Sequence, residues 1–395
     1  MIRNKHILCF GPGDWWQMNP SCTTHIMRRL ARNNEVVYVN PYSADLGGGV
    51  RMGASSRIVR KLKSFARAVR RESPALTTLS PIFLPWQGTK FVDQLNNNGV
   101  WLQVSTLLKL LGTRPDLLWI ENPRASDALD WFPNVPSVYH VSDAFWECPY
   151  TRDKSALRRR DEELTKRCGV VICVSDELFA IKARVRSSAL YYLGHGVDYE
   201  RFAAAAASGA RSPHLEGLAQ PIVGYFGTLT NQNDIPLLEW CATNAPDISF
   251  VFGGTVTGGD YGPLRRLPNT RFLGQVPYDE IPALAVGFGV CILPWRQTEW
   301  IRHCNPLKTY EYFASGRPIV SVPINEVQRI GGDLVSFAAT PEEFLNAIRW
   351  ELSNDNPARA DARQQLAEPR SWERHHSALA DLLMPLLDCV GEPRR

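Results

Sequence analysis

Residues 303–320 read HCNPLKTYEYFASGRPIV and combine a helix start, two charged side chains and a following apolar run. Asn305 is a good N-cap residue and Pro306 suits the first helical turn, so the pattern predicts a helix over residues 307–314. Gly316 stands just past the expected end of that helix. The apolar residues after it predict a buried strand.

Lys308 and Glu311 are three residues apart, so the predicted helix presents both on one face. The free N–H groups and the positive dipole end of such a helix favour an anion, and Lys308 adds a full charge one turn in. A site for phosphate beside an acceptor for hydroxyl groups is typical of nucleotide binding. The alternative is an ordinary surface ion pair on a capped helix.

The segment NPLKTYEYFASGRPIV at 305–320 resembles the donor-binding helix of GT-B glycosyltransferases, in particular the bacterial retaining-type group with a Glu-x7-Glu donor motif. The resemblance implies that Glu311 accepts hydrogen bonds from the ribose of a nucleotide sugar and that Lys308 lies near the diphosphate. Many relatives carry an earlier Glu that contacts the donor sugar, and His303 stands at that place here.

Two further segments carry the same resemblance. GHGVD at 194–198, with Phe202 after it, is similar to the text that closes the first GT-B domain. YFGT at 225–228 is similar to the glycine turn after the first strand of the second domain. Gly227 and Thr228 would then approach the donor diphosphate with their backbone. The implied fold class is α/β, a GT-B architecture of two Rossmann-like, doubly wound domains that face a cleft.

The order of these segments predicts four parts of the chain. Residues 1–200 form an acceptor-binding domain, and residues 201–220, which are poor in large apolar side chains, form a linker. Residues 221–371 form the nucleotide-sugar domain. The amphipathic end, 372–395, is expected to be a helix that packs back across both domains.

Composition limits the classes of function. The chain has 395 residues, 44% of them hydrophobic, which is enough for two well-built cores. A net charge of +4 indicates no general affinity for nucleic acid. The nine cysteines are scattered, and Cys9, Cys173 and Cys291 lie in apolar runs, so they predict core residues rather than disulfides or a zinc site. Without a long apolar run or a signal peptide, a cytoplasmic protein is expected.

A glycine loop, GPGDWW, follows the first predicted strand, which is expected over residues 6–10. Gly11, Gly13 and Asp14 are expected to face the acceptor side of the cleft, and Trp15 offers a flat surface for a sugar or lipid. The loop lacks the Gly-x-Gly-x-x-Gly spacing of a dinucleotide site, so a tight turn with packing tryptophans is the alternative. His25, on the next predicted helix, is a further cleft candidate or a packed histidine.

Residues 51–71, RMGASSRIVRKLKSFARAVRR, contain basic residues and no acid, with apolar side chains at helical spacing. This pattern predicts a basic amphipathic helix, which can lie in the headgroup region of an anionic membrane. The relatives that the resemblance implies often act on lipid-linked acceptors. The alternative is a domain helix with a solvated basic face. The residues expected to contact the membrane are Arg60, Lys61, Lys63, Phe65 and Arg67.

The chemistry is expected at the end of a predicted strand over 137–141. Open parallel sheets place ligands at the carboxyl ends of their strands, and His140 and Asp143 stand there. A carboxylate can take the proton of an acceptor hydroxyl as that oxygen attacks the anomeric carbon. Asp143 is therefore the predicted base and His140 the second candidate. Alternatively, Asp143 caps the next turn.

The donor sugar is expected beside the loop that precedes the helix at 307–314. Arg296, Arg302 and His303 lie in this loop, where an arginine can recognise a carboxylated sugar or simply face solvent. The resemblance also makes the backbone near Val276 a candidate for contact with the nucleobase. Residues 230–234 lack the Arg and Lys that many relatives use for phosphate, so Lys308 and the helix start would carry that charge.

Together these patterns predict a glycosyltransferase that moves a sugar from a nucleotide diphosphate sugar, expected to be a uridine derivative, to a polysaccharide or lipid-linked oligosaccharide at the inner membrane surface. No cofactor and no metal is expected, since no carboxylate cluster suggests one. Two alternatives remain. One is a nucleotide-sugar epimerase of GT-B fold. The other is a catalytically weak sugar-binding component of a polysaccharide assembly.

Overall fold

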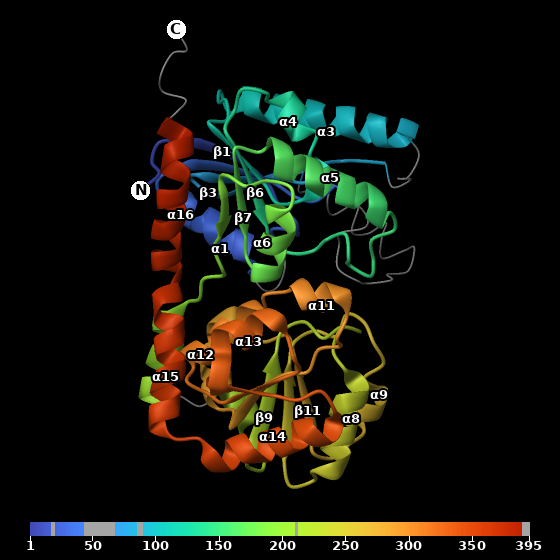
Figure 1. Cartoon of the computed structure of the whole chain (residues 1–395), viewed down its shortest axis with the longest axis vertical. Coiled ribbons are helices and arrows are strands. Elements are labelled where there is room, and N and C mark those ends of the chain that lie inside the picture. The colour runs from blue at the N-terminus through green and yellow to red at the C-terminus, as the bar shows by residue number, and fades with distance from the viewer. Residues whose placement is uncertain (17–19, 43–67, 85–89, 210–211, 389–395) are drawn as a thin grey trace. The chain divides into compact units, whose positions relative to one another are not determined.

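The computed structural model describes most of the chain, and it divides into two compact units. Unit 1 comprises Met1–Gly194 and His376–Arg395, and unit 2 comprises His195–His375. Each unit is an α/β layer structure with helices around a sheet (Figure 1). The described residues are 1–16, 20–42, 68–84, 90–209 and 212–388.

Unit 1 contains a sheet of eight strands in the order β3-β4-β2-β1-β5-β6-β7-β8. All neighbours are parallel except β3, which runs antiparallel to β4. The strands and helices are β1 (His6–Phe10), α1 (Cys22–Leu30), β2 (Glu35–Val39), β3 (Val69–Ser73), β4 (Leu76–Leu79), α3 (Lys90–Leu110), β5 (Leu117–Ile120), α4 (Ala128–Trp131), β6 (Ser137–Val141), α5 (Lys154–Arg167), β7 (Val170–Cys173), α6 (Asp176–Ala183) and β8 (Leu190–Tyr192).

The central strands of unit 1 are continuous apolar runs, because a parallel sheet with helices on both faces buries both sides of each strand. β5, LLWI, is buried at all four positions. The predicted buried cysteines at positions 9 and 173 are confirmed as core residues of this unit. The loops that leave β1, β5 and β6 therefore emerge at one edge of the sheet, where the carboxyl ends of parallel strands meet.

The predicted basic helix at 51–71 is wrong at its last residues, 69–71, which form a strand. Val69 begins strand β3, which pairs with β4 in antiparallel register and exposes Arg70 and Arg71. Pairing with an existing sheet edge gives these residues backbone hydrogen bonds without the cost of nucleating a separate helix. The residues expected to contact the membrane lie outside the described part of the chain, namely Arg60, Lys61, Lys63, Phe65 and Arg67.

Unit 2 contains a wholly parallel sheet of six strands in the order β11-β10-β9-β12-β13-β14. Its elements are α7 (Tyr199–Ser208), β9 (Ile222–Phe226), α8 (Ile235–Asn244), β10 (Ser249–Gly253), α9 (Gly262–Arg265), β11 (Thr270–Gly274), α10 (Ile281–Val286), β12 (Val290–Leu293), α11 (Glu299–His303), α12 (Leu307–Ala314), β13 (Ile319–Ser321), α13 (Asn325–Gly331), β14 (Val335–Phe337), α14 (Pro341–Asn354) and α15 (Pro357–Ala367).

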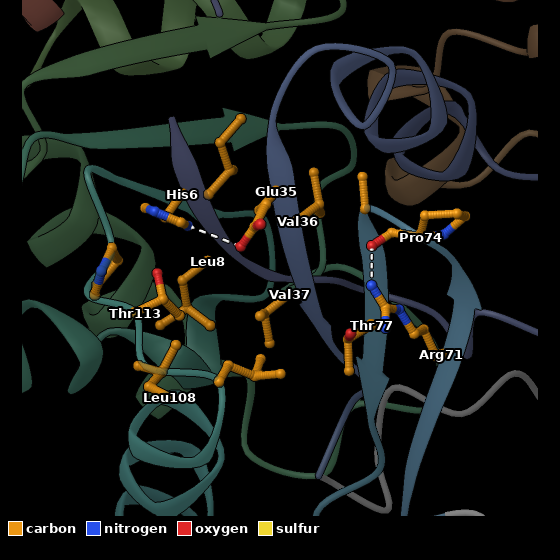
Figure 2. A pocket seen from close by; sticks show the side chains of 14 residues that line it. His6, Leu8, Glu35, Val36, Val37, Arg71, Pro74, Thr77, Leu108 and Thr113 are labelled. Atoms are coloured by element: carbon orange, nitrogen blue, oxygen red, sulfur yellow. Dashed lines mark hydrogen bonds and ion pairs between the residues drawn. The ribbon is translucent and has the colours of Figure 1, made fainter. Parts of the chain in front are cut away.

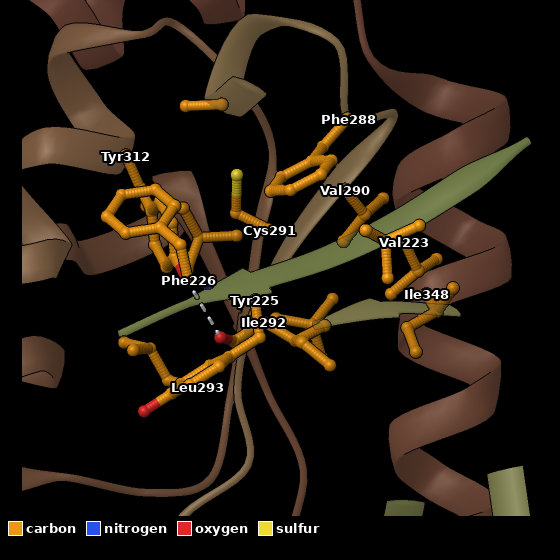
Figure 3. Close-up of a cluster of buried hydrophobic side chains, with 14 of the residues drawn as sticks. Val223, Tyr225, Phe226, Phe288, Val290, Cys291, Ile292, Leu293, Tyr312 and Ile348 are labelled. Atoms are coloured by element: carbon orange, nitrogen blue, oxygen red, sulfur yellow. Dashed lines mark hydrogen bonds between the residues drawn. The ribbon is translucent and has the colours of Figure 1, made fainter. Parts of the chain in front are cut away.

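The core of unit 2 packs around β9 and β12 (Figure 3). Gly224 is required at the centre of β9, because a Cβ atom there would lie 2.2 Å from the ring of Phe288. On the same side of the core, the hydroxyl of Tyr312 donates to the carbonyl of Ile292 and accepts from the N–H of Phe226, each at 3.4 Å. These contacts fix α12 against the two central strands.

The predicted linker at 201–220 differs from the structure. Its first part belongs to helix α7, which packs against α10 and α12 and ends at Gly209 with φ 62°. Phe202 of this helix is fully buried, as expected for the residue that follows the GHGVD segment. The run of alanines is therefore part of unit 2, because small side chains allow α7 to pack closely.

The division between the units falls inside the last helix, α16 (Trp372–Asp388), at His375 and His376. In unit 2, the Trp372 N–H donates to the carbonyl of Val197 at 3.0 Å. In unit 1, Leu386 lies where a Cβ on Gly169 would be 2.5 Å away. None of the helices in the described residues is long and apolar enough to cross a bilayer.

Candidate functional site

Helix α12 has the predicted bounds, but its start differs from the prediction. Pro306 is the N-cap residue, and no side chain caps the helix. The Asn305 side chain is buried and donates instead to the hydroxyl of Tyr310 at 2.9 Å. This internal partner replaces the expected cap because Asn305 faces the core. Gly316 follows the helix with φ 71°, a conformation that favours glycine.

Lys308 is held at the carboxyl end of β9. Its Nζ donates to the hydroxyl of Tyr225 at 2.6 Å, and it lies 4.2 Å from the ring centre of Tyr225 and 5.0 Å from that of Trp295. Burial alone would raise the pKa of Tyr225, but the charge and hydrogen bond of Lys308 outweigh it and lower that pKa. The ammonium group is thus positioned by two aromatic rings rather than by an acid.

The glycine turn after β9 lies directly against this lysine. A Cβ on Gly227, whose φ is 122°, would lie 2.8 Å from Lys308 Nζ. The Gly227 N–H donates to the carbonyl of Gly253, and a Cβ on Gly254 would lie 1.9 Å from the Gly227 oxygen. Thr228, next in the chain, is exposed. The structure therefore brings Gly227, Thr228 and Lys308 together at one edge of the sheet.

Glu311 lies on the same helix, 5% exposed. Its Oε1 is 3.4 Å from the hydroxyl of Tyr278, which also donates to Asp198 Oδ2 at 2.9 Å. Burial raises the pKa of Glu311 to about 7, opposed by the charge of Lys308 and increased by that of Asp198. The sequence pattern identified Glu311 but not its tyrosine neighbour. The carboxyl group is therefore poised between its neutral and charged forms near neutral pH.

The pKa of Glu311 predicts a pH-dependent affinity for a ligand whose hydroxyls donate to the carboxylate. Protonation removes the negative charge that strengthens the hydrogen bonds accepted by this carboxyl group. Affinity is therefore expected to fall about 10-fold between about pH 8 and about pH 6, because the charged fraction falls as pH drops below 7. Calorimetric titration at several pH values, with the nucleotide diphosphate sugar that the sequence predicts as ligand, measures this affinity. Glu311→Gln, which does not titrate, is expected to bind weakly at every pH. An equally steep pH dependence in that variant would contradict the assignment.

The remaining residues expected around the donor differ in exposure and in their local partners. Arg296 and Arg302 are exposed, and Arg302 lies 3.8 Å from Glu299. His303 ends the short helix α11, where the sequence suggested a loop, and its Nδ1 donates to the Glu299 carbonyl at 2.5 Å. Val276 is buried beside Gln275, whose side chain donates to the Val276 carbonyl at 3.2 Å.

In unit 1, the GPGDWW loop packs inward rather than offering a sugar platform. Trp15 is 5% exposed, and its ring meets the ring of Tyr38 edge-on at 4.9 Å. The Tyr38 hydroxyl donates to the Gly13 carbonyl at 2.6 Å, and a Cβ on Gly11 would lie 1.8 Å from that hydroxyl. The expected exposed face of Trp15 is therefore wrong, because Tyr38 fills the space above the glycine loop. Asp14 remains exposed.

His140 and Asp143 follow the predicted strand β6 but have different surroundings. His140 is 1% exposed, and its Nδ1 lies 3.1 Å from the carboxylate of Glu121 at the end of β5. Asp143 is partly buried and its Oδ1 accepts from the N–H of the next residue, Ala144, at 2.8 Å. His25, also buried, lies on α1 with Arg29 Nη1 3.5 Å from its Nδ1.

Glu121 is the main polar residue that the sequence prediction missed. It accepts from the Thr23 hydroxyl and lies fully buried. Burial alone would raise its pKa, but the charge of His140 and hydrogen bonds from His140, Ser142 and Thr23 lower it below the ordinary value. A signal was present, since Glu121 is the first polar residue after the apolar run of β5 and so marks the carboxyl end of a central strand.

A separate hollow of about 200 Å³ lies at the opposite, amino-terminal edge of the unit 1 sheet (Figure 2). His6 and Glu35 face each other there at 3.1 Å, and Arg71 donates to the Pro74 carbonyl at 2.6 Å. None of the predicted site residues lines it. Across the described residues, no group of three or more His, Cys, Asp and Glu side chains is arranged to hold a metal ion.

Solved structures share the architecture of the whole chain. Alr3699/HepE of Anabaena, solved with UDP-glucose, superposes with a TM-score of 0.68 at 15% identity, covering 97% of this chain and 100% of that one. A UDP-forming trehalose-phosphate synthase from Burkholderia xenovorans gives a TM-score of 0.66 at 13% identity, covering 99% and 100%. The chain has the GT-B fold. Its two units, each built on a mainly parallel sheet, correspond to the two Rossmann-like domains of that fold, as predicted.

A relative by sequence is TuaH of Bacillus subtilis (strain 168), named as a teichuronic acid biosynthesis glycosyltransferase. It is 25% identical over 253 residues, which cover 60% of this chain and 63% of TuaH. No family model matches the chain. Lys308, Gly227 and Thr228, which we call the Lys308 group, lie at the carboxyl ends of the strands of unit 2, the second Rossmann-like unit of the GT-B fold.

Proposed function

We propose that the protein is a glycosyltransferase that takes a sugar from a nucleotide diphosphate sugar. The observation that carries the proposal is the pairing of a held cation, Lys308, with a buried carboxyl group, Glu311, on one face of α12 beside the Gly227 turn. A diphosphate needs positive charge and close backbone approach, and a ribose needs a hydroxyl acceptor. These three features meet at one edge of unit 2.

Each donor group has a proposed partner in unit 2. Lys308 neutralises the diphosphate, the backbone of Gly227 and Thr228 approaches it, and Glu311 accepts from the ribose. Val276 lies near the base with its backbone. The proposed contacts of the donor sugar and of the helix start are Arg296, Arg302, His303, Asn305 and Pro306. The protein supplies the charge that a metal would otherwise bring, so the proposed reaction needs no metal or cofactor.

A uridine diphosphate sugar is the proposed donor. HepE was solved with UDP-glucose, and the Burkholderia xenovorans enzyme is named as UDP-forming. Both share the fold of this chain over nearly its whole length. The proposed acceptor is a polysaccharide or lipid-linked oligosaccharide, supported by the name of TuaH, which refers to teichuronic acid biosynthesis. The base stands at the carboxyl end of β6, where Asp143 and His140 are the candidates.

Release of UDP separates the proposed function from its alternatives. Purified protein with UDP-glucose and a crude acceptor fraction from cell envelopes is expected to release UDP and to transfer labelled glucose to the acceptor. Conversion of the UDP-sugar to its epimeric UDP-sugar without acceptor, and without net release of UDP, would instead support a GT-B epimerase. Binding of UDP-glucose without turnover across a panel of UDP-sugars would support a sugar-binding component.

We also propose that the basic residues at 51–71 hold the enzyme at the cytoplasmic face of an anionic membrane. Reversing the charges of Arg60, Lys61 and Lys63 is expected to reduce sedimentation with phosphatidylglycerol vesicles by about 10-fold or more, since each basic residue adds about 1 kcal/mol near such a surface. Vesicles of neutral phosphatidylcholine provide the control. Equal sedimentation of the wild type and the charge-reversed variant would contradict this role.

A further inference from the structure

We propose that Glu121 is a positioning residue for His140 and that His140, through Nε2, takes the proton of the acceptor hydroxyl. The inference rests on the proposed function, because it assigns a role within glycosyl transfer. It chooses His140 over Asp143 at the carboxyl end of β6. The sequence pattern identified His140 but not the carboxylate of Glu121 that contacts it.

The geometry fixes the ring of His140. Nδ1 lies 3.1 Å from Glu121 Oε2, and both side chains are 1% exposed. The ring also packs on Trp119, with 5.1 Å between ring centres and a tilt of 52°. A carboxylate can only accept, so in the neutral imidazole Nδ1 carries the hydrogen and Nε2 carries the lone pair. Among the described residues, none hydrogen-bonds to Nε2, so this nitrogen remains for a substrate.

Burying the Glu121 carboxylate is energetically unfavourable unless a positive charge lies beside it. Transfer of an unpaired carboxylate into a protein interior is strongly unfavourable, and neutral hydrogen bonds recover only part of that cost. Hydrogen bonds from Thr23, Ser142 and His140 stabilise the Glu121 carboxylate, and the positive charge of a protonated His140 lowers its pKa further. An imidazolium at His140 would compensate it fully. The site is therefore built to stabilise the charge that His140 acquires when it accepts a proton.

The buried titratable groups around His140 and Glu121 are neutral, so the Glu121 carboxylate is the main charge beside His140. Cys9 on β1 and Cys22 on α1 feel the Glu121 charge, and burial first and Glu121 second raise the pKa of both thiols. Tyr38 on β2 is likewise kept neutral, because burial raises its pKa. Asp143 follows in the chain, with one oxygen bonded to the Ala144 N–H. The described neighbours therefore add no second cation to the pair.

The proposed step conserves protons and electron pairs. The acceptor hydroxyl gives its proton to Nε2 of His140 while a lone pair of that oxygen forms the bond to the anomeric carbon. The bond from the anomeric carbon to the phosphate oxygen breaks, and its electron pair stays on that oxygen, which leaves with UDP. His140 becomes an imidazolium beside Glu121 and returns its proton to solvent after product release. No oxidant or further reactant is needed.

The test is the pH profile of kcat/KM for sugar transfer. Glu121→Gln is expected to lower kcat by about 10-fold or more while KM for UDP-glucose stays within about 2-fold, and to move the acid limb to a pH about 1 lower. The limb moves down because, without the carboxylate charge, protonation of the imidazole becomes less favourable. Glu121→Asp keeps the charge, so its acid limb is expected to stay at the wild-type position, with partly restored kcat.

Several results would overturn the inference. A lower kcat in Glu121→Gln with the acid limb unmoved would indicate a purely structural role. Wild-type turnover in His140→Gln, or loss of turnover in Asp143→Asn with His140→Gln active, would move the base to Asp143. The His140 variant also decides between the two bases if Glu121→Gln does not fold. Absence of transfer by the wild type would instead reject the proposed function, so the two failures remain distinguishable.

Discussion

Lys308→Ala is expected to weaken the binding of UDP-glucose by about 100-fold. The lysine supplies the full positive charge at the Gly227 turn, and a charge-assisted contact with a phosphate contributes about 2–3 kcal/mol, which corresponds to that change in Kd. Isothermal titration calorimetry measures the difference directly. Since Nζ lies 2.6 Å from the Tyr225 hydroxyl, Tyr225→Phe is expected to weaken binding by a smaller factor, about 3-fold to 10-fold.

The matched control for Lys308 is Arg349→Ala, which removes one positive charge from the same unit. Arg349 is exposed on α14 and pairs with Asp247 at 3.0 Å, apart from the Lys308 group. Its loss is expected to leave the affinity for UDP-glucose unchanged. If Lys308→Ala bound UDP-glucose as tightly as this control, the donor site would lie elsewhere in the molecule.

Lys182→Met is expected to lower the free energy of unfolding by about 3–5 kcal/mol. Lys182 and Asp161 form a buried ion pair, 1% and 6% exposed, and the Tyr139 hydroxyl donates to the same carboxylate at 2.6 Å. Removing the ammonium group leaves Asp161 buried without its charge partner, which costs far more than the methionine recovers by packing. Urea unfolding followed by circular dichroism measures the loss.

Two comparisons sharpen this test. Lys166→Met removes a lysine from an exposed pair with Glu162 on α5 and is expected to leave the unfolding midpoint unchanged. Removing both charges, in Lys182→Met with Asp161→Asn, is expected to recover part of the lost stability, because no uncompensated charge remains. Equal unfolding midpoints for Lys182→Met and Lys166→Met would show that the buried pair does not stabilise unit 1.

Many elements of the fold could be predicted from local sequence. The strands at 6–10 and 137–141 and the helix at 307–314 have the predicted bounds. Local signals determine them, namely apolar runs for the strands, and a proline before the helix with a glycine after it. The helix cap was misassigned because Asn305 finds its partner at Tyr310, inside the core. The alanine-rich start of 201–220 favours a helix locally, but its packing against α10 and α12, which assigns it to unit 2 rather than to a linker, depends on distant segments.

The candidate sites show the same division. Lys308 and Glu311 could be identified because their i and i+3 spacing is a property of one helix. Tyr225 and Tyr278 could not, since each reaches these residues from a strand or turn far away in the chain. Trp15 was misplaced because the side chain that covers its loop, Tyr38, lies on the next strand. Contacts between distant segments carry no local pattern.

By itself, the sequence determined the alternating α and β elements, the glycine turns and the residues that face one side of α12, because periodicity and capping act over a few residues. The tertiary structure decided the states of those residues. It placed Lys308 on Tyr225, buried Glu311 so that its pKa rises to about 7, and paired His140 with Glu121. These properties depend on desolvation and on charges brought together by the fold, which no single segment of the chain contains.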